Sequence, residues 1–105
     1  MTASLTVRVA AGRAIYDGVH KYMRYPGPRN ARFSVIMHGY DREDAEIDIL
    51  HAIEREFGQI VSPNCARNDD GSPKCVIMVR FQSEESAKKT VDDWDQQIVS
   101  GRFCI

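Results

Sequence analysis

The sequence of 105 residues has none of the long apolar segments that mark membrane-spanning or secreted proteins. No apolar run approaches the roughly 18 residues that suggest a membrane span, and the opening stretch MTASLTVRVAAGR has no uninterrupted apolar segment of the secretory kind. We therefore expect an intracellular protein, in the nucleus or cytoplasm, with no membrane partner. A chain of this length forms one domain with a two-layer core, without room for a large enclosed active site.

Cysteine is scarce and is not spaced for a metal site or a disulfide framework. The sequence contains an odd number of cysteines, Cys65, Cys75 and Cys104. They form neither a CxxC pair nor a zinc pattern, and the histidines show no metal-ligand spacing either. Cys75 and Cys104 lie in apolar runs, where a free thiol behaves as a small apolar side chain. The pattern indicates a reducing compartment and predicts no metal and no cofactor.

Positive charge is concentrated near the amino terminus. Residues 1–33 contain six basic residues and one acidic residue, whereas the remainder contains eight basic and fourteen acidic residues. Such an arm indicates an anionic partner, or else it docks on the acidic body of its own chain. Residues 20–32 interleave cations with tyrosines, as in segments that contact nucleic acid, although the tyrosines of a helix end also pack inward. The candidate contacts here are Lys21, Arg24, Tyr25 and Arg29.

Hydrophobic periodicity predicts an α+β fold. Residues 4–9 alternate as a strand, 12–25 have the spacing of an amphipathic helix, and the two prolines of 25–30 mark a linker. The rest predicts strand, helix, strand, strand, helix and strand at 32–40, 41–58, 59–66, 74–81, 83–99 and 101–105. Asp41 is the expected cap of the helix at 41–58, and either Ser83 or Ser86 is the expected cap of the helix at 83–99. This order favours a ferredoxin-like sandwich at 32–105, with a four-stranded antiparallel sheet and both helices on one face, after a basic extension at 1–31.

Alternation along the strands assigns side chains to the two faces of this sheet. The face under the helices takes Val35, Met37, Cys75, Ile77, Val79, Phe81, Phe103 and Ile105. The other face carries an apolar patch of Ile36, Val76 and Met78. Polar and basic residues surround that patch, namely His38, Lys74, Arg80 and Arg102. Because exposed apolar patches usually mark contact surfaces, three occupants fit: RNA, a protein partner, or the chain's own helix at 12–25.

Residues 32–105 resemble the RNA recognition motif family. VIMHGY (35–40) stands where the family has its first signature strand, DILHAIEREFGQI (48–60) resembles its first helix and turn, and KCVIMVRF (74–81) stands at the pattern K/R-G-F/Y-G/A-F-V-x-F/Y. The resemblance implies a βαββαβ fold whose free sheet face stacks bases on aromatic side chains. Ile36, Val76 and Met78 match the stacking positions, and Cys75 matches a glycine, so the chain is similar to a degenerate member.

The resemblance implies non-catalytic binding of RNA or other single-stranded nucleic acid. Lys74, Arg80 and Arg102 would then contact phosphates, and the basic arm would add charge. The base platform would consist of His38, Val76 and Met78, with Ile36 beside them. Each base–aromatic stack contributes about 1–3 kcal/mol, so the missing aromatic residues favour an alternative, a protein–protein interaction module that uses the same sheet or the helical face.

Catalytic patterns are weak throughout. Residues 10–24 and 66–71 faintly resemble the phosphate loop and the arginine–asparagine turn of acylphosphatase, with Arg24 and Asn68 in the two roles, but they do not match residue by residue. No other segment resembles a nucleophile with a base, a phosphate loop or a metal site. The sequence therefore predicts that the protein is not an enzyme.

Overall fold

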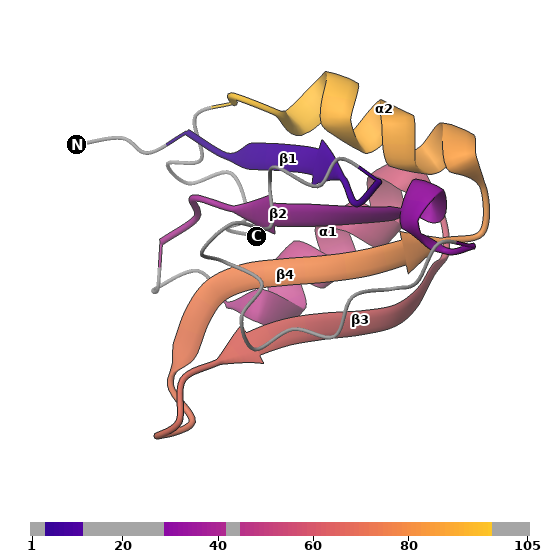
Figure 1. Ribbon diagram of the computed structural model, residues 1–105. Helices are drawn as coiled ribbons and strands as arrows, with labels where there is room; N and C mark the ends of the chain where they lie inside the picture. Colours follow the sequence, from indigo (N-terminus) through magenta and orange to yellow (C-terminus); the bar gives the residue numbers. More distant parts are fainter. Residues whose placement is uncertain (1–3, 12–28, 42–44, 98–105) are drawn as a thin grey trace.

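The computed structural model describes residues 4–11, 29–41 and 45–97, which form a sheet with two helices on one face (Figure 1). The sheet is antiparallel, with strand order β1-β2-β4-β3. The elements are β1 (Thr6–Val9), the 3-10 helix η2 (Ala31–Phe33), β2 (Ser34–His38), α1 (Glu46–Phe57), β3 (Ile60–Arg67), β4 (Pro73–Phe81) and α2 (Glu84–Trp94). The predicted two-layer α+β architecture is confirmed.

β1 is an edge strand of this sheet. It pairs with β2, Val7 lying opposite Met37 and Arg8 opposite Ile36. On its other side Leu5 donates to the carbonyl of Gln97 at 2.9 Å and accepts from the N–H of Gln96 at 2.7 Å. The strand that the sequence assigns to an extension is therefore part of the sheet, and Leu5, just before β1, is hydrogen-bonded to the chain that follows α2. The helix predicted at 12–25 and the strand predicted at 101–105 lie outside the described residues.

The main core lies between the helices and the sheet. It contains the described residues that alternation assigns to this face: Val35, Met37, Ile77, Val79 and Phe81 are at most 2% exposed, and Cys75 packs against them. Ile49, Ile53 and Phe57 face them from α1. Trp94 joins the two helices, because its ring meets that of Phe57 edge-on and its Nε1 donates to Glu56 at 2.7 Å. The described residues assigned to this layer are confirmed, whereas Phe103 and Ile105 lie outside the described residues. Leu5, Val7 and Tyr40 also belong to the core, although alternation did not assign them to it.

Both helices are shorter than the sequence predicts. α1 begins at Glu46 with Ala45 as its N-cap, so the expectation that Asp41 caps this helix is wrong. Tyr40 is only 5% exposed and belongs to the core. Residues 39–41, which include it, are neither helix nor strand. The N-cap of α2 is Ser83, one of the two expected residues, and its side chain accepts a hydrogen bond from the N–H of Ser86. The helix ends at Trp94, and Asp95 has an extended backbone.

β3 is the other edge strand, and the Pro63 within it indicates an edge or a bulge. Its pairing with β4 is interrupted between Val61 and Asn64 and again between Cys65 and Arg67. Two residues of this hairpin have left-handed backbone angles, Ser62 at φ 53° and Cys75 at φ 60°. None of the described helices is long and apolar enough to cross a membrane.

Candidate nucleic-acid interface

The sheet face away from the helices has an apolar centre that is closed to solvent. Ile36 is fully buried, Val76 is 5% exposed and Met78 is 7% exposed. They form a second cluster with three alanines, Ala10, Ala31 and Ala66. These residues, which would form the base platform if RNA occupied the patch, are therefore inaccessible in this structure. The proposed cover, the helix at 12–25, lies outside the described residues.

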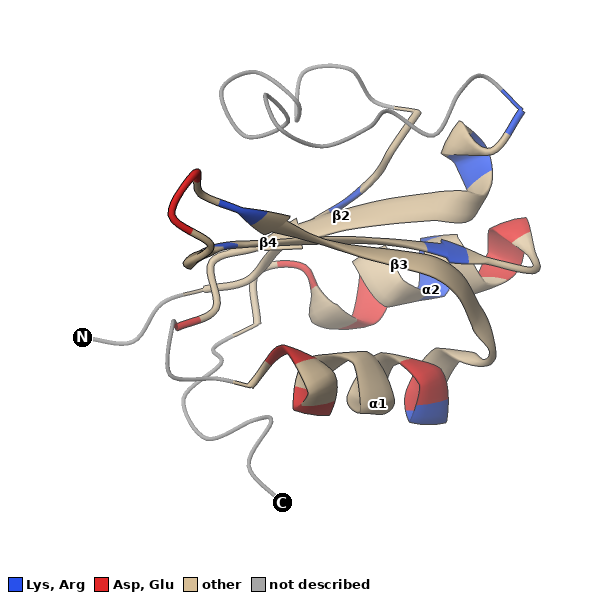
Figure 2. Ribbon diagram, turned by 90° about the horizontal axis from the view of Figure 1, so that it is seen from below, with Lys and Arg blue, Asp and Glu red and all other residues tan. Residues whose placement is uncertain are grey.

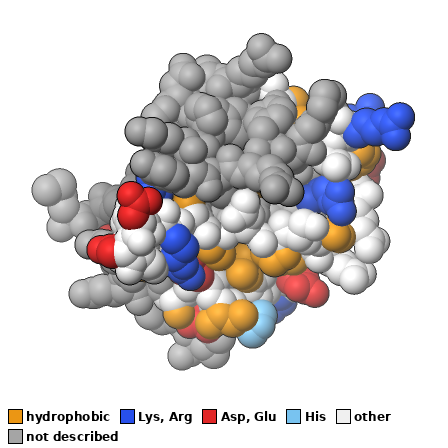
Figure 3. All heavy atoms as spheres, turned by 60° about the horizontal axis from the view of Figure 1, so that its bottom comes forward, with side chains coloured by type: hydrophobic (Ala, Val, Ile, Leu, Met, Phe, Trp, Pro, Cys, Tyr) orange, Lys and Arg blue, Asp and Glu red, His pale blue; other side chains and the backbone are white. Residues whose placement is uncertain are grey.

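Charge divides the domain into two sides. The four strands together carry four Lys or Arg residues, on β1, β3 and β4, and no acidic residue, whereas the two helices carry eight acidic and three basic residues. Figure 2 shows this division, with most Asp and Glu on the helices and at the tip of the β3–β4 hairpin. In Figure 3 Lys and Arg side chains lie at both ends of a band of apolar side chains. Basic groups thus gather on the strand side, as a polyanion requires.

The four basic residues of the strands differ in their neighbours. Arg8 pairs with Asp95, and Arg67 pairs with Glu46. Lys74 is half-buried near the start of β4, and Arg80 is half-buried near its end. Within the part of the chain that the structure describes, Arg80 has no ion-pair partner, so its charge is free for an external anion.

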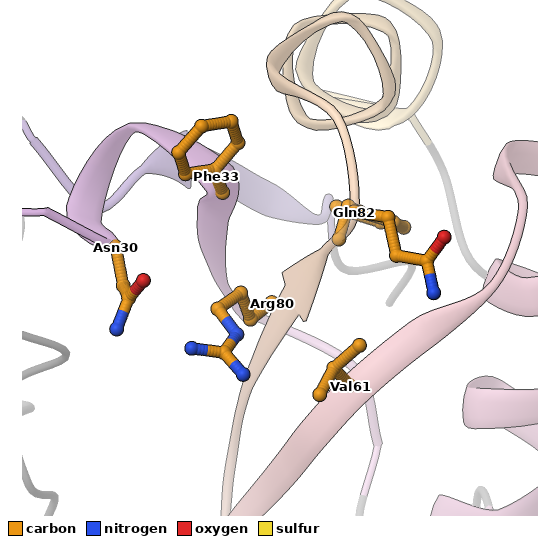
Figure 4. A pocket seen from close by; sticks show the side chains of 6 residues that line it. Asn30, Phe33, Val61, Arg80 and Gln82 are labelled. Carbon is orange, nitrogen blue, oxygen red and sulfur yellow. The ribbon is translucent and has the colours of Figure 1, made fainter.

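Arg80 lines a pocket of about 270 Å³ at the end of β4. In the sheet it lies between Ser34 of β2 and Val61 of β3, which places it in the row beyond Met78 on the closed face. The pocket is completed by the turn before β2 and by the exit from β4, through Asn30, Phe33, Phe81 and Gln82. Figure 4 shows the Arg80 guanidinium between Asn30 and Val61, with the ring of Phe33 beyond it.

Two further cations lie near this pocket. Arg32 is exposed, and its guanidinium carbon lies 4.9 Å from the centre of the Phe33 ring, a cation–π contact. Arg29, a predicted contact of the basic arm, is also exposed and directly precedes Asn30. The chain thus brings one predicted residue of the arm and one of the sheet, Arg29 and Arg80, to the same end of the sheet. The other predicted contacts, Lys21, Arg24, Tyr25 and Arg102, lie outside the described residues.

His38 lies at the opposite end of β2, between Thr6 and Val76. Burial, and secondarily the positive charge of Arg8, lowers the pKa of His38 below its ordinary value of 6.5. The ring is therefore neutral at physiological pH. It is able to donate or accept one hydrogen bond but provides no positive charge for a phosphate.

Cys65 and Tyr40 lie near Glu46 at the start of α1, and neither side chain is reactive at neutral pH. Burial raises the pKa of the Cys65 thiol to about 12, and a hydrogen bond to Glu46 adds to the effect. Only the thiolate is a strong nucleophile, so this cysteine is unreactive at neutral pH. Burial also raises the pKa of Tyr40, whose hydroxyl has no hydrogen-bond partner among the described residues. In the same residues no three His, Cys, Asp or Glu side chains are grouped to hold a metal.

Phe33 and Asn30 are pocket residues that the sequence did not identify. Residues 32 and 33 read as the start of a strand, but they belong to η2, from which Phe33 lines the pocket. Their proximity to Arg80 depends on the register between β2 and β4. The sequence ARF (31–33) places an aromatic residue beside a cation, which can indicate a binding site. Without the register between β2 and β4, however, it did not show that Phe33 lies near Arg80.

A sequence model of the RNA recognition motif matches residues 43–104. The match covers more than half of the chain and includes α1, β3, β4 and α2, whereas β1 and β2 precede it. No curated protein is similar enough in sequence to match. The antiparallel sheet with two helices on one face agrees with the fold of this family of non-catalytic RNA-binding domains. The chain belongs to the RNA recognition motif family.

Proposed function

We propose that this protein binds RNA or other single-stranded nucleic acid without catalysing a reaction, and that the strand side of the domain faces the phosphate backbone. The observation that carries the proposal is the division of charge, because the strands hold basic residues and no acidic residue. Phosphate contacts supply most of the sequence-independent affinity for nucleic acid. Family membership supports the same ligand.

In this proposal Lys74 and Arg80 contact phosphates at the two ends of β4, and Arg29 extends the basic surface beyond η2. Arg102, Lys21, Arg24 and Tyr25 remain predicted contacts of the same kind. Ile36, Val76 and Met78 are buried and contribute no base stacking while the face is closed. The affinity therefore depends more on charge than it does in a domain that stacks bases on exposed aromatic residues.

A salt-dependent titration tests the proposal. Fluorescence anisotropy of a labelled uridine oligomer is measured over a range of salt concentrations, for the wild type and for the double variant Lys74→Gln/Arg80→Gln. Each phosphate contact contributes about 0.7 to the slope of log K against log salt for single strands, so losing two contacts should reduce the slope by about 1.4. The matched control is Lys88→Gln/Lys89→Gln, which removes the same charge from exposed positions of α2.

The control variant should retain the wild-type slope. The proposal is wrong if the wild type does not bind the oligomer at low salt. Equal losses in both double variants would mean that net charge, and not the strand side, determines binding.

The alternative, a protein–protein interaction module, has less support. It would use either the sheet or the helical face. On the sheet it needs an open apolar patch, and Ile36, Val76 and Met78 are buried. Among the described residues the only large apolar side chain that is exposed is Ile47 on α1, at 57%. A single exposed side chain of this kind is ordinary on a soluble domain. A partner that binds with little salt dependence, and whose binding the Lys74→Gln/Arg80→Gln variant leaves unchanged, would favour this alternative.

A further inference from the structure

We infer that the pocket beside Arg80 takes one unpaired nucleotide of the bound strand, with the phosphate on Arg80 and the base against the pocket's apolar wall. This inference rests on the proposed function and adds the place where a base is contacted. It moves base contact from the closed centre of the sheet to the end of β4.

The first support for this site is that solvent reaches Arg80, whereas the centre of the sheet face is closed. Met78, two residues before Arg80 and on the same face, is 7% exposed, whereas Arg80 is half-buried and lines an open hollow. The volume of about 270 Å³ lies just below the lower end of ordinary ligand pockets, about 300 Å³. It suits one base and not a stack of bases.

The chemistry of the walls also fits a nucleotide. Phe33 and Val61 line the pocket with apolar side chains, which favour contact with the flat face of a base. Asn30 and Gln82 add two side-chain amides, and each amide both donates and accepts hydrogen bonds, as base edges require. Arg80 adds a planar cation whose N–H groups match the oxygens of a phosphate.

The polar groups of the pocket are available to a ligand. The side chain of Asn30 does not cap η2, and within the described part of the chain its amide has no hydrogen-bond partner. Gln82 donates to Gln59 at 3.4 Å, a long contact that leaves its carbonyl oxygen free to accept. Figure 4 shows the Asn30 amide and the Arg80 guanidinium on the same side of the pocket. A bound nucleotide would give both groups a partner.

The test separates phosphate contact from base contact in the full chain. Anisotropy titrations with uridine, cytidine and adenosine oligomers are run on the wild type, Arg80→Gln, Asn30→Ala and Gln82→Ala. Arg80→Gln should weaken all three oligomers by a similar factor, at least about tenfold, because it removes a charge-assisted hydrogen bond. Asn30→Ala or Gln82→Ala should change the affinities unequally and so alter the preference among bases. The matched control is Arg55→Gln, at an exposed position of α1, and it should change the affinity for each of the three oligomers by no more than about twofold.

A measurement on the wild type keeps the inference testable if a variant does not fold. In ¹H–¹⁵N spectra a uridine oligomer should shift the side-chain amide signals of Asn30 and Gln82. The amide of Asn68, which is bonded to Ser72 in the hairpin turn at the far end of β4, should not move. If the wild type binds RNA while these signals stay fixed or all the pocket variants bind normally, the pocket is not the site and the proposed function stands. If the wild type binds no RNA, both fail.

Discussion

The carboxylate of Asp95 accepts a hydrogen bond from the backbone N–H of Val7 at 2.9 Å. The same carboxylate pairs with the guanidinium of Arg8. Asp95 is the C-cap of α2, so one side chain joins the end of the second helix to the edge strand of the sheet. Burial alone would raise the pKa of Asp95, but the contacts from Val7 and Arg8 outweigh it and hold that pKa below its ordinary value of 3.8.

We expect Asp95→Ala to lower the free energy of unfolding by about 1–3 kcal/mol, because the N–H of fully buried Val7 loses its partner. Arg8→Ala should cost less than about 1 kcal/mol, since the arginine side chain is 46% exposed and pairs at the surface. Urea unfolding followed by the fluorescence of Trp94, the only tryptophan, measures both variants. Equal costs would mean that the ion pair, and not the bond to Val7, holds β1.

Gly39→Ala should destabilise the fold more than Gly71→Ala does. Both glycines have left-handed backbone angles, φ 97° and 88°, so alanine pays a similar conformational cost at either position. At Gly39, however, the new Cβ would lie 2.4 Å from the backbone oxygen of Ser4, whereas at Gly71 it would meet nothing within 4 Å. The clash should add about 1–3 kcal/mol to the difference in unfolding free energy. Thermal unfolding of the two variants side by side measures it, and equal stabilities would contradict the close approach of Ser4.

Cys75 occupies a position where glycine should be preferred. Its φ is 60°, and it stands at the glycine of the family's signature strand. We expect Cys75→Gly to be more stable than Cys75→Ala by about 1 kcal/mol, because only alanine has a Cβ that opposes the left-handed conformation. At Cys65, which has no positive φ, the order should reverse, since glycine in a regular strand is less stable than alanine. Urea midpoints of the four variants test the crossover, and the same order at both sites would refute it.

Stability should fall as the pH drops below about 6.5, and His38 should account for part of the change. The pKa of His38 is lowered in the folded protein, so below its ordinary value of 6.5 the unfolded chain binds a proton that the folded chain does not. The free energy of unfolding therefore decreases with falling pH until the folded state is also protonated. Urea unfolding above and below pH 6.5 measures this decrease, and His38→Gln should lack this contribution. Parallel curves for the wild type and the variant would show that His38 is not responsible.

Alternation along the strands was sufficient to predict the main core. Val35, Met37, Ile77 and Val79 face the helices as the period of two requires, and Ser83 caps α2 as its side chain predicts. Periodicity describes a single strand, however, and does not specify which strand lies beside it. The pairing of β1 with β2 and the register that brings Arg80 close to Phe33 and Asn30 are long-range contacts, and they could not be predicted from local pattern.

The candidate site was predictable only in part for the same reason. Arg80 and Lys74 followed from the signature strand, and Arg29 from the run of cations before it. The burial of Ile36, Val76 and Met78 depends on what packs above them, which an apolar strand does not reveal. Apolar residues on both faces of β4 showed that the strand is central, but they left open whether its outer face binds a ligand.

The bond between Val7 and Asp95 spans 88 positions of the chain, and this separation has a consequence for biosynthesis. β1 is synthesised well before Asp95, whose carboxylate holds it. Until then β1 lacks its contact with the end of α2, and closing so long a loop slows folding. The nascent chain is therefore expected to reach its native sheet only after α2 has emerged, and stalling translation before Asp95 should leave β1 sensitive to protease.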